Sequence, residues 1–479
     1  MNPPPTPRES LSVIDSISLI VGIVIGTSIF RISPGVFLQA GSPTVGMALW
    51  AVGGMLSFIG ALCYAELVVA YPQRGGDLIF LTQAYGPGMG YLFSWVQLTT
   101  IMTGNIGVMA FACADYGAVF SPFVATHAPH TAAAAIVLLT IGNFVAAHVG
   151  RRMQWLLAAA KIVGLIAILL AACLAPRAAP STNRPEAVTV VAEESLPPKP
   201  EANWGLAMVF VLYAFGGWND AAYVAADLQN RRRNVPLALG GGLLGITLFY
   251  LAVNGAYLAV LGPDRLTHTI TPAGDLLKHV WGERGERFIS AIVVISALGA
   301  INGMLYSGAR LFAAAGERHH SLRWMAVPHT GHNPRRALVT MAAISLILVL
   351  TVGTAAGRDV IDAAFRTIGL PLIRWANFDG GFGALLAVFA PVFWMFFTLT
   401  SLSTIALRLR DPARFGEFRL PFFPLAQLLF IATCGYMLWN SLSYAGGLVV
   451  FTLPVVLTGI TLHWLTDKEP LGSDVVSLK

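Results

Sequence analysis

The chain alternates between long apolar stretches and short loops that hold most of its charged residues. A run of about 20 apolar residues is long enough to cross a bilayer as a helix. The pattern therefore predicts an all-α polytopic membrane protein with twelve transmembrane spans. We place them near residues 12–38, 44–71, 86–120, 131–149, 153–175, 204–230, 236–261, 286–315, 336–353, 384–408, 421–441 and 445–465. This divides the chain into a tail (1–11), a ten-span core (12–408), two further spans (409–465) and a second tail (466–479).

The composition agrees with a membrane protein and excludes several other classes. Of the 479 residues, 56% are hydrophobic and 11% are charged, whereas soluble domains carry about 25% charged residues. No phosphate-binding GxxxxGK[ST] motif occurs, which argues against an ATP-driven pump. The four cysteines form no CxxC pair and indicate small buried side chains rather than a metal site. We expect no enzymatic activity, no cofactor, no metal and no nucleic-acid partner.

The distribution of basic residues predicts the orientation. The net charge is +6, and Lys and Arg concentrate in the loops that share a side with both termini. Because cytoplasmic loops are enriched in these residues, we expect both termini to be cytoplasmic and the protein to lie in the plasma (inner) membrane. In this assignment Arg31 counts among the charges of the outer face. The stretch 357–381 is too charged to face lipid, and its apolar spacing predicts a short amphipathic helix at an interface.

Glycines interrupt two apolar stretches that take corresponding places in the two halves of the core. The first interruption is at Gly26, and the second is at Gly216 and Gly217. An interruption frees backbone N–H and C=O groups, which persist in a membrane only where they line a cavity. Paired interruptions of this kind point to the substrate site of a transporter.

The first interruption offers donors and acceptors to a zwitterion. Thr27 and Ser28 begin the following half-helix, whose free N–H groups would hold a carboxylate. The carbonyls near Val24 and Ile25 would accept hydrogen bonds from an ammonium group. An α-amino acid carries both groups. The alternative is that Gly22 and Gly26 form a GxxxG packing face in an unbroken helix.

The second interruption is surrounded by aromatic and polar side chains. The aromatic residues are Tyr213, Phe215 and Trp218, which form either a pocket wall or ordinary helix packing. Asn219 and Asp220 follow directly, and polar groups at this depth are costly unless they are used. We therefore assign this segment to the substrate site.

Two further charged residues lie within predicted spans. Lys161 would cost about 2.5–3.5 kcal/mol near a helix centre, and its ammonium group can take the place of a bound sodium ion. The alternative is that Lys161 reaches the cytoplasmic interface along its flexible stem. Glu66 lies near the inner end of the second span, where we expect a structural ion pair or, alternatively, a proton site.

Several short motifs resemble those of amino acid–polyamine–organocation transporters, in particular their L-type amino acid transporter branch. They are Gly26-Thr27-Ser28-Ile29-Phe30, Ala40-Gly41-Ser42-Pro43, Cys63-Tyr64-Ala65-Glu66-Leu67, Gly75-Gly76-Asp77 and Gly216-Gly217-Trp218-Asn219. The resemblance covers most of residues 12–350 and, more weakly, 384–465. It implies a LeuT-like fold with two inverted five-helix repeats and discontinuous first and sixth helices.

The resemblance also implies roles for individual residues. Thr27 and Ser28 would meet the substrate carboxylate, and carbonyls of Val24, Tyr213 and Gly216 would meet the amine. Tyr213 falls at an aromatic gate, Asn219 at a polar cavity position and Trp394 at an aromatic position of the tenth span. Lys161 falls at the lysine that replaces a sodium site.

The sequence departs from the family pattern at a few positions. Ser28 replaces a glycine, so its side chain narrows the approach to the backbone. The loop 121–130 lacks the cysteine by which animal members bind an accessory subunit, so we expect no disulfide-linked partner. Asp220 stands where no acid is expected and favours a cationic substrate or proton coupling.

These observations lead to three functional hypotheses. The first is secondary active amino acid transport by alternating access, through sodium-independent exchange or facilitated transport. The second is proton-coupled symport of amino acids or amines that uses Glu66, Asp220 or Lys161. The third is an amino acid sensor that does not transport.

Overall fold

Helix initiation follows local sequence signals. The computed structural model describes residues 24–73, 75–145, 150–175, 201–219, 231–327, 334–416 and 418–466. Ser42 caps α3 (Pro43–Ala70), because its side chain accepts a 3.2 Å hydrogen bond from the Val45 N–H and a proline follows it. Asn203 caps α10 (Trp204–Ala214) in the same way, with a bond of 2.9 Å from the Leu206 N–H. These caps satisfy N–H groups that a helix start leaves free.

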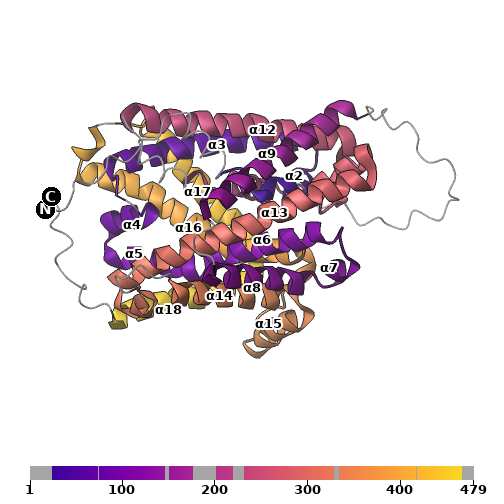
Figure 1. The fold of residues 1–479 in the computed structure, drawn as a ribbon. Helices are drawn as coiled ribbons and strands as arrows, with labels where there is room; N and C mark the ends of the chain where they lie inside the picture. Colours follow the sequence, from indigo (N-terminus) through magenta and orange to yellow (C-terminus); the bar gives the residue numbers. More distant parts are fainter. Residues whose placement is uncertain are drawn as a thin grey trace.

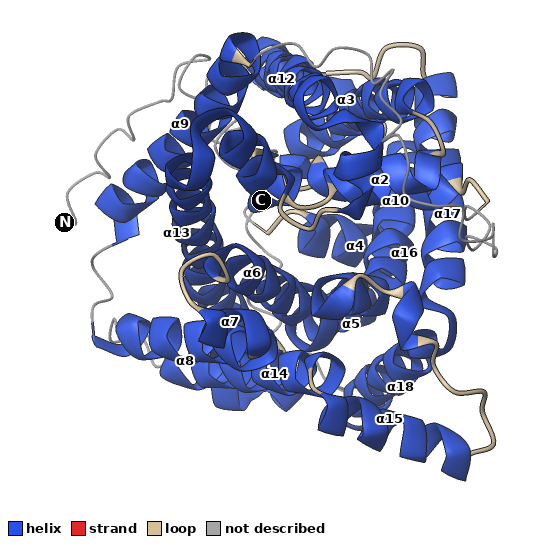
Figure 2. Ribbon diagram, turned by 90° about the vertical axis from the view of Figure 1, so that its right-hand side faces the viewer, coloured by secondary structure: helices blue, strands red, loops and turns tan. Residues whose placement is uncertain are grey.

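The described residues form helices and connecting loops and contain no strand. Figure 2 shows many of the helices end-on. The remaining α-helices are α2 (Ser33–Ala40), α4 (Asp77–Tyr85), α5 (Pro87–Val96), α6 (Met102–Gly117), α7 (Pro122–Thr126), α8 (Ala128–Val145), α9 (Gly150–Leu174), α12 (Arg231–His268), α13 (Pro272–Arg318), α14 (Arg335–Gly353), α15 (Ala355–Thr367), α16 (Gly380–Arg410), α17 (Leu425–Ala445) and α18 (Val449–Thr466). The 3-10 helices are η1 (Thr27–Phe30), η3 (His320–Met325), η4 (Trp375–Asn377), η5 (Arg414–Gly416) and η6 (Gly446–Leu448), and a π-helical turn, η2 (Gln97–Ile101), joins α5 to α6.

Length and composition allow seven of the helical segments in the described ranges to cross a membrane. They are Pro43–Ala70, Pro87–Gly117, Arg233–His268, Pro272–Arg318, Arg335–Gly353, Gly380–Arg410 and Leu425–Thr466, and shorter apolar helices cover Ala128–Phe144, Lys161–Leu174 and Trp204–Ala214. The protein is therefore an all-helical polytopic membrane protein. The count of twelve spans stays a prediction, as does the division into tails, core and added spans.

The helices pack in two main groups. In the first, α3 contacts α12, α10 and α17, and α2 contacts α10 and α12. In the second, α13 lies against α6, α8, α9 and α14. Figure 1 shows α3 and α12 side by side along one edge of the molecule, with α8 and α14 toward the opposite edge. Helix α16 packs against α6, α4 and α14 as well as α17, so it contacts both groups.

The charged stretch after α14 contains the amphipathic helix that the sequence predicts. Helix α15 buries Ile361 and Phe365, while the side chain of Val360 is exposed. Its buried face packs against the end of α17 and against η6, through Ala445 and Leu448. The helix is confirmed, and its location at a membrane interface stays a prediction.

Candidate substrate site at two helix breaks

The backbone leaves the helical conformation at the first glycine interruption. Val24 is helical, whereas Gly26 is extended, with φ −92° and ψ 174°. A new, tighter helix, η1, begins at Thr27. An unbroken helix through Gly26 is therefore wrong, because one hydrogen-bonded ladder cannot continue through an extended residue. The first N–H groups of η1 are those that a helix start leaves without intrahelical partners.

The side chain of Ser28 lies close to Gly26. A Cβ atom at Gly26 would lie 3.2 Å from Ser28 Oγ and 3.8 Å from the Val24 carbonyl oxygen. Ser28 is itself buried. Its hydroxyl therefore occupies space beside the extended residue, in keeping with the narrowed approach expected from the sequence.

Thr27 joins the first break to the opposite group of helices. Its hydroxyl lies 3.0 Å from that of Ser296 on α13, and both side chains are fully buried. No local pattern distinguishes Ser296, which is one of many serines in apolar helices. The hydrogen bond orients the Thr27 side chain toward α13.

The second glycine interruption is a turn at the end of α10. The Tyr213 carbonyl accepts a 3.0 Å hydrogen bond from the Gly216 N–H. Gly217 has φ +99°, a conformation that side-chain-bearing residues rarely adopt. Trp218 and Asn219 are helical again, and Asp220 lies outside the described residues. Both interruptions are thus present in the backbone.

Tyr213 points from the second break toward α6. Its hydroxyl donates a 2.8 Å hydrogen bond to Asn105 Oδ1, and its ring lies 6.0 Å from that of Phe389 on α16. Asn105 could not be predicted as a site residue, because nothing near it in the sequence distinguishes it from other polar residues in apolar helices. These two contacts bring α6, α10 and α16 together beside the second break.

A small pocket lies beside the second break. Its lining includes Gly216, Trp218 and Trp394, so it brings together three residues that were predicted to form the site. The Trp218 ring packs against Tyr64 at 5.0 Å and Phe397 at 5.7 Å. The residues of the first break do not belong to this lining, and neither does Phe215, whose buried ring packs against Trp50 and Tyr250.

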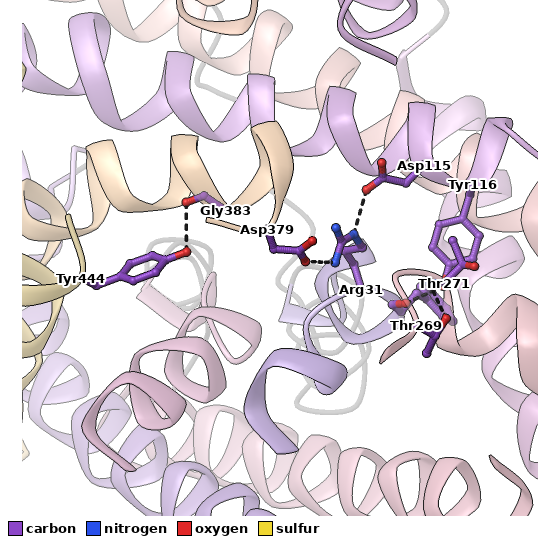
Figure 3. Close-up of polar contacts among 9 residues, drawn as sticks. Arg31, Asp115, Tyr116, Thr269, Thr271, Asp379, Gly383 and Tyr444 are labelled. Carbon is purple, nitrogen blue, oxygen red and sulfur yellow. Dashed lines mark hydrogen bonds and ion pairs between the residues drawn. The ribbon is translucent and has the colours of Figure 1, made fainter. Parts of the chain in front are cut away.

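Arg31 forms an ion-pair cluster just beyond the first break, in which Arg31 is buried and the side chain of Asp379 is 55% exposed (Figure 3). Its guanidinium Nε lies 2.8 Å from Asp115 Oδ2 on α6, and Nη1 pairs with Asp379, which precedes α16. Only 4% of the Arg31 side chain is exposed, so it lies within the helix packing, and its assignment to the outer face of the membrane stays a prediction. The hydroxyl of Tyr116, the next residue after Asp115, donates a hydrogen bond to the Phe30 carbonyl. The ion pairs and this hydrogen bond hold the segment after the first break against α6 and the start of α16.

A second buried ion pair lies at the other end of α16. Glu66 Oε1 on α3 is 3.0 Å from Arg408 Nη1, and Glu66 Oε2 accepts a 3.3 Å hydrogen bond from the Leu420 N–H. Glu66 is fully buried. Its geometry matches the structural ion pair expected from the sequence, and a role in proton coupling stays a prediction.

Lys161 lies within α9, which packs against α12 and α13. Its side chain is half-buried. Within the described residues, no hydrogen bond or ion pair to Lys161 is found, so its role as a sodium replacement stays a prediction. All four cysteines are free thiols; Cys63, Cys113 and Cys434 are buried and Cys173 is exposed.

Comparison with known proteins identifies the family. The family model described as "Amino acid permease" matches residues 11–463. The chain is 28% identical to the b(0,+)-type amino acid transporter 1 of Oryctolagus cuniculus, over 84% of this chain and 76% of that protein. It is 26% identical to the human large neutral amino acids transporter small subunit 2 (98% of this chain, 83% of the relative) and 24% identical to the human cystine/glutamate transporter (98% and 88%). With nearly its whole length covered, this chain belongs to the amino acid permease family of membrane transporters.

Proposed function

We propose that this protein carries amino acids across a membrane by alternating access, with the substrate bound between the two helix breaks. The observation that carries the proposal is the presence of two breaks, at Gly26 and at Gly216–Gly217, in a chain whose relatives are named as amino acid transporters. Broken helices place free N–H and C=O groups at membrane depth, where a ligand with charged ends satisfies them.

Each break would hold one part of the substrate. The N–H groups at the start of η1, from Thr27 and Ser28, lie at the positive end of a helix and suit a carboxylate. The carbonyl oxygens of Val24, Tyr213 and Gly216 suit an ammonium group. The Tyr213 carbonyl already accepts one hydrogen bond, from the Gly216 N–H, and retains a second lone pair. The pocket lined by Trp218 and Trp394 has room for about one water molecule, so it would have to widen to accept the substrate side chain.

Two ion-pair clusters suit alternating access. Arg31 with Asp115 and Asp379 joins helices at one end of α16, and Glu66 with Arg408 joins helices at the other. Alternating access requires that the two ends open in turn, and paired charges break and re-form more readily than a large apolar interface. We infer a LeuT-like arrangement of two inverted repeats, which the two helix breaks, at Gly26 and at Gly216–Gly217, support.

We infer that transport does not depend on sodium and proceeds by exchange or facilitated transport. The basis is Lys161, a half-buried ammonium on α9. Lys161→Ala should slow transport and alter its ion dependence, and unchanged kinetics would exclude this role. We also infer that the protein lies in the plasma (inner) membrane with both termini in the cytoplasm, because Lys and Arg concentrate in the loops on that side. We infer that it works without a disulfide-linked subunit, because the loop 121–130 has no cysteine.

Reconstitution into liposomes tests the proposal. Uptake of labelled amino acids is measured with a panel of amino acids and amines as competitors, with and without amino acid inside. Uptake that requires internal amino acid supports exchange. Uptake driven by an imposed pH gradient would instead establish the proton-coupled symporter, and binding without flux would establish the sensor.

A site variant and a matched control connect the activity to the breaks. Gly216→Val should abolish uptake, because even a Cβ there would lie 3.0 Å from the Tyr213 carbonyl oxygen. Gly435→Val on α17 adds the same side chain where a Cβ meets nothing within 4 Å, and it should leave uptake intact. Equal activity of the two variants would place the substrate elsewhere.

A further inference from the structure

Two arginine side chains lie over aromatic rings at one end of the second group of helices. The guanidinium carbon of Arg310, on α13, is 4.2 Å from the centre of the Tyr306 ring. That of Arg335, the first residue of α14, is 5.6 Å from the centre of the Phe144 ring on α8. A ring face attracts a guanidinium group and restricts its rotation. Both cations are therefore held in place by apolar partners.

Neither arginine has an acidic partner in the described part of the chain. No ion pair or hydrogen bond to the Arg310 or Arg335 side chain is found there, and both residues are exposed. Arg31 and Arg408, by contrast, each pair with a carboxylate. The charges of Arg310 and Arg335 therefore remain available to an anion from outside the protein.

The two arginines flank one small pocket. It lies between α8, α13 and α14, and its lining includes Asn143, Tyr306 and Pro334. Tyr306 lies under the Arg310 guanidinium group, and Pro334 directly precedes Arg335. The pocket has room for about one water molecule, so an anion would bind at its mouth, beside the arginines, rather than inside it.

The start of α14 has the properties of a membrane–water interface. Its N-cap residue, Pro334, gives no side-chain cap, so the first N–H groups of the helix lack a partner within it and favour an anion. Arg336 donates a 3.3 Å hydrogen bond to the carbonyl of Trp324, whose side chain is 48% exposed. Tryptophan is enriched at the level of the lipid headgroups, so a phosphate headgroup would meet the protein here.

Exposed apolar side chains continue from this end along α8 and α14, which lie side by side (Figure 2). Leu138 and Ile141 on α8 are 68% and 54% exposed, and Val339 on α14 is 47% exposed. At 1.5 Å per residue, all three lie within about 10 Å of the arginine end. Cations at the end of an exposed apolar surface suit an anion that carries acyl chains better than they suit a soluble one.

We propose that Arg310 and Arg335 bind the phosphate group of an anionic phospholipid, whose acyl chains lie along α8 and α14. Guanidinium groups bind phosphate oxygens through paired hydrogen bonds, and the first N–H groups of α14 add further donors. Under the predicted orientation, the lipid belongs to the cytoplasmic leaflet. The inference is independent of the proposed function, because it requires only that the protein lies in a membrane.

Lipid binding to the purified protein in detergent tests the proposal. The probes are phosphatidylglycerol and phosphatidylcholine with the same acyl chains, and native mass spectrometry at several lipid concentrations gives the two affinities. Thermal unfolding at 0.15 M salt provides a second readout. The wild-type protein should bind phosphatidylglycerol at least tenfold more tightly. Equal affinities would overturn the proposal, and competition by an equal concentration of glycerol phosphate would overturn the lipid in favour of a soluble phosphate.

The double variant Arg310→Gln with Arg335→Gln connects the preference to the two arginines. It should weaken the affinity for phosphatidylglycerol about thirtyfold, equivalent to about 2 kcal/mol, because basic residues near a membrane surface attract anionic lipid. The affinity for phosphatidylcholine should not change. Unchanged binding of phosphatidylglycerol would overturn the assignment.

Arg318→Gln with Arg366→Gln is the matched control. It removes the same two positive charges from exposed positions, where neither side chain has a ring contact or an ion pair among the described residues. Arg318 lies about 12 Å further along α13 than Arg310, beyond the screening length of about 8 Å at 0.15 M salt. Binding should match the wild type. An equal loss in both double variants would overturn the site in favour of diffuse attraction by net charge.

Arg310→Gln alone keeps the proposal testable if the first double variant does not fold. The Arg310 side chain is exposed and has no acidic partner among the described residues, so its replacement leaves no buried carboxylate without a counter-charge. The affinity for phosphatidylglycerol should fall about fivefold. An unchanged affinity in the folded single variant would overturn the role of Arg310.

Discussion

The hydroxyls of Thr27 and Ser296 lie 3.0 Å apart although 269 residues separate them in the chain. One belongs to the first helix break and the other to α13, so the bond ties the break to the second group of helices. Both side chains are fully buried, and among the described residues each hydroxyl has its hydrogen-bond partner in the other.

Thr27→Val should therefore destabilise the protein by about 1–3 kcal/mol, because it leaves the Ser296 hydroxyl buried without that partner. The double variant Thr27→Val with Ser296→Ala should recover most of this loss, since replacing both partners by apolar groups is nearly neutral. Thermal unfolding in detergent measures the effect, with Thr27→Ser as control. Substrate affinity close to wild type in the double variant would support a backbone role for Thr27, and a large loss would assign its hydroxyl to the substrate.

Arg31→Gln should destabilise the protein by about 3–5 kcal/mol, because it leaves the carboxylate of Asp115 largely buried without its counter-charge. Adding Asp115→Asn should restore part of the stability. Arg414→Gln is the control: Arg414 pairs with Asp411 at 2.7 Å, but the two side chains are 50% and 42% exposed, and such pairs contribute about 0–1 kcal/mol. Similar losses in melting temperature for Arg31→Gln and Arg414→Gln would contradict a stabilising role of the largely buried Arg31–Asp115 pair.

Gly217→Ala should destabilise the second break by more than about 1 kcal/mol, because φ at this residue is +99° and alanine avoids that region. Transport should fall with it. Gly245→Ala on α12 is the control, since a Cβ there meets nothing within 4 Å, and glycine inside a helix costs about 0.5–1 kcal/mol relative to alanine. Parallel melting curves and uptake assays distinguish the two, and equal tolerance would show that the turn is not required.

Glu66→Gln should lower stability, because Arg408 then lacks the negative charge of its buried partner. The double variant with Arg408→Gln should fold better and keep uptake if Glu66 acts only in the ion pair. The measurement is uptake with and without an imposed pH gradient. A wild-type response to the gradient that disappears in the double variant would identify Glu66 as a proton site.

Much of the fold could be predicted because its signals are local. Apolar length places the helices, and the predicted ends at residues 261 and 286 lie close to kinks at Gly262 (φ +73°) and Gly282 (φ +66°). The two breaks were predictable for the same reason, since glycine marks them directly. The ion pairs of Arg31 could not be predicted, because its acidic partners lie 84 and 348 residues away in the chain.

The linear chain specifies where helices form and where they break, because hydrophobic length and backbone freedom act over one or two turns. Packing decides what the breaks contact. Tyr250 reaches both of them, and Ser296, Asn105 and Asp115 approach them from two other helices. These partners look like ordinary polar residues in apolar helices until packing brings them within hydrogen-bond distance, where a buried polar group must be satisfied.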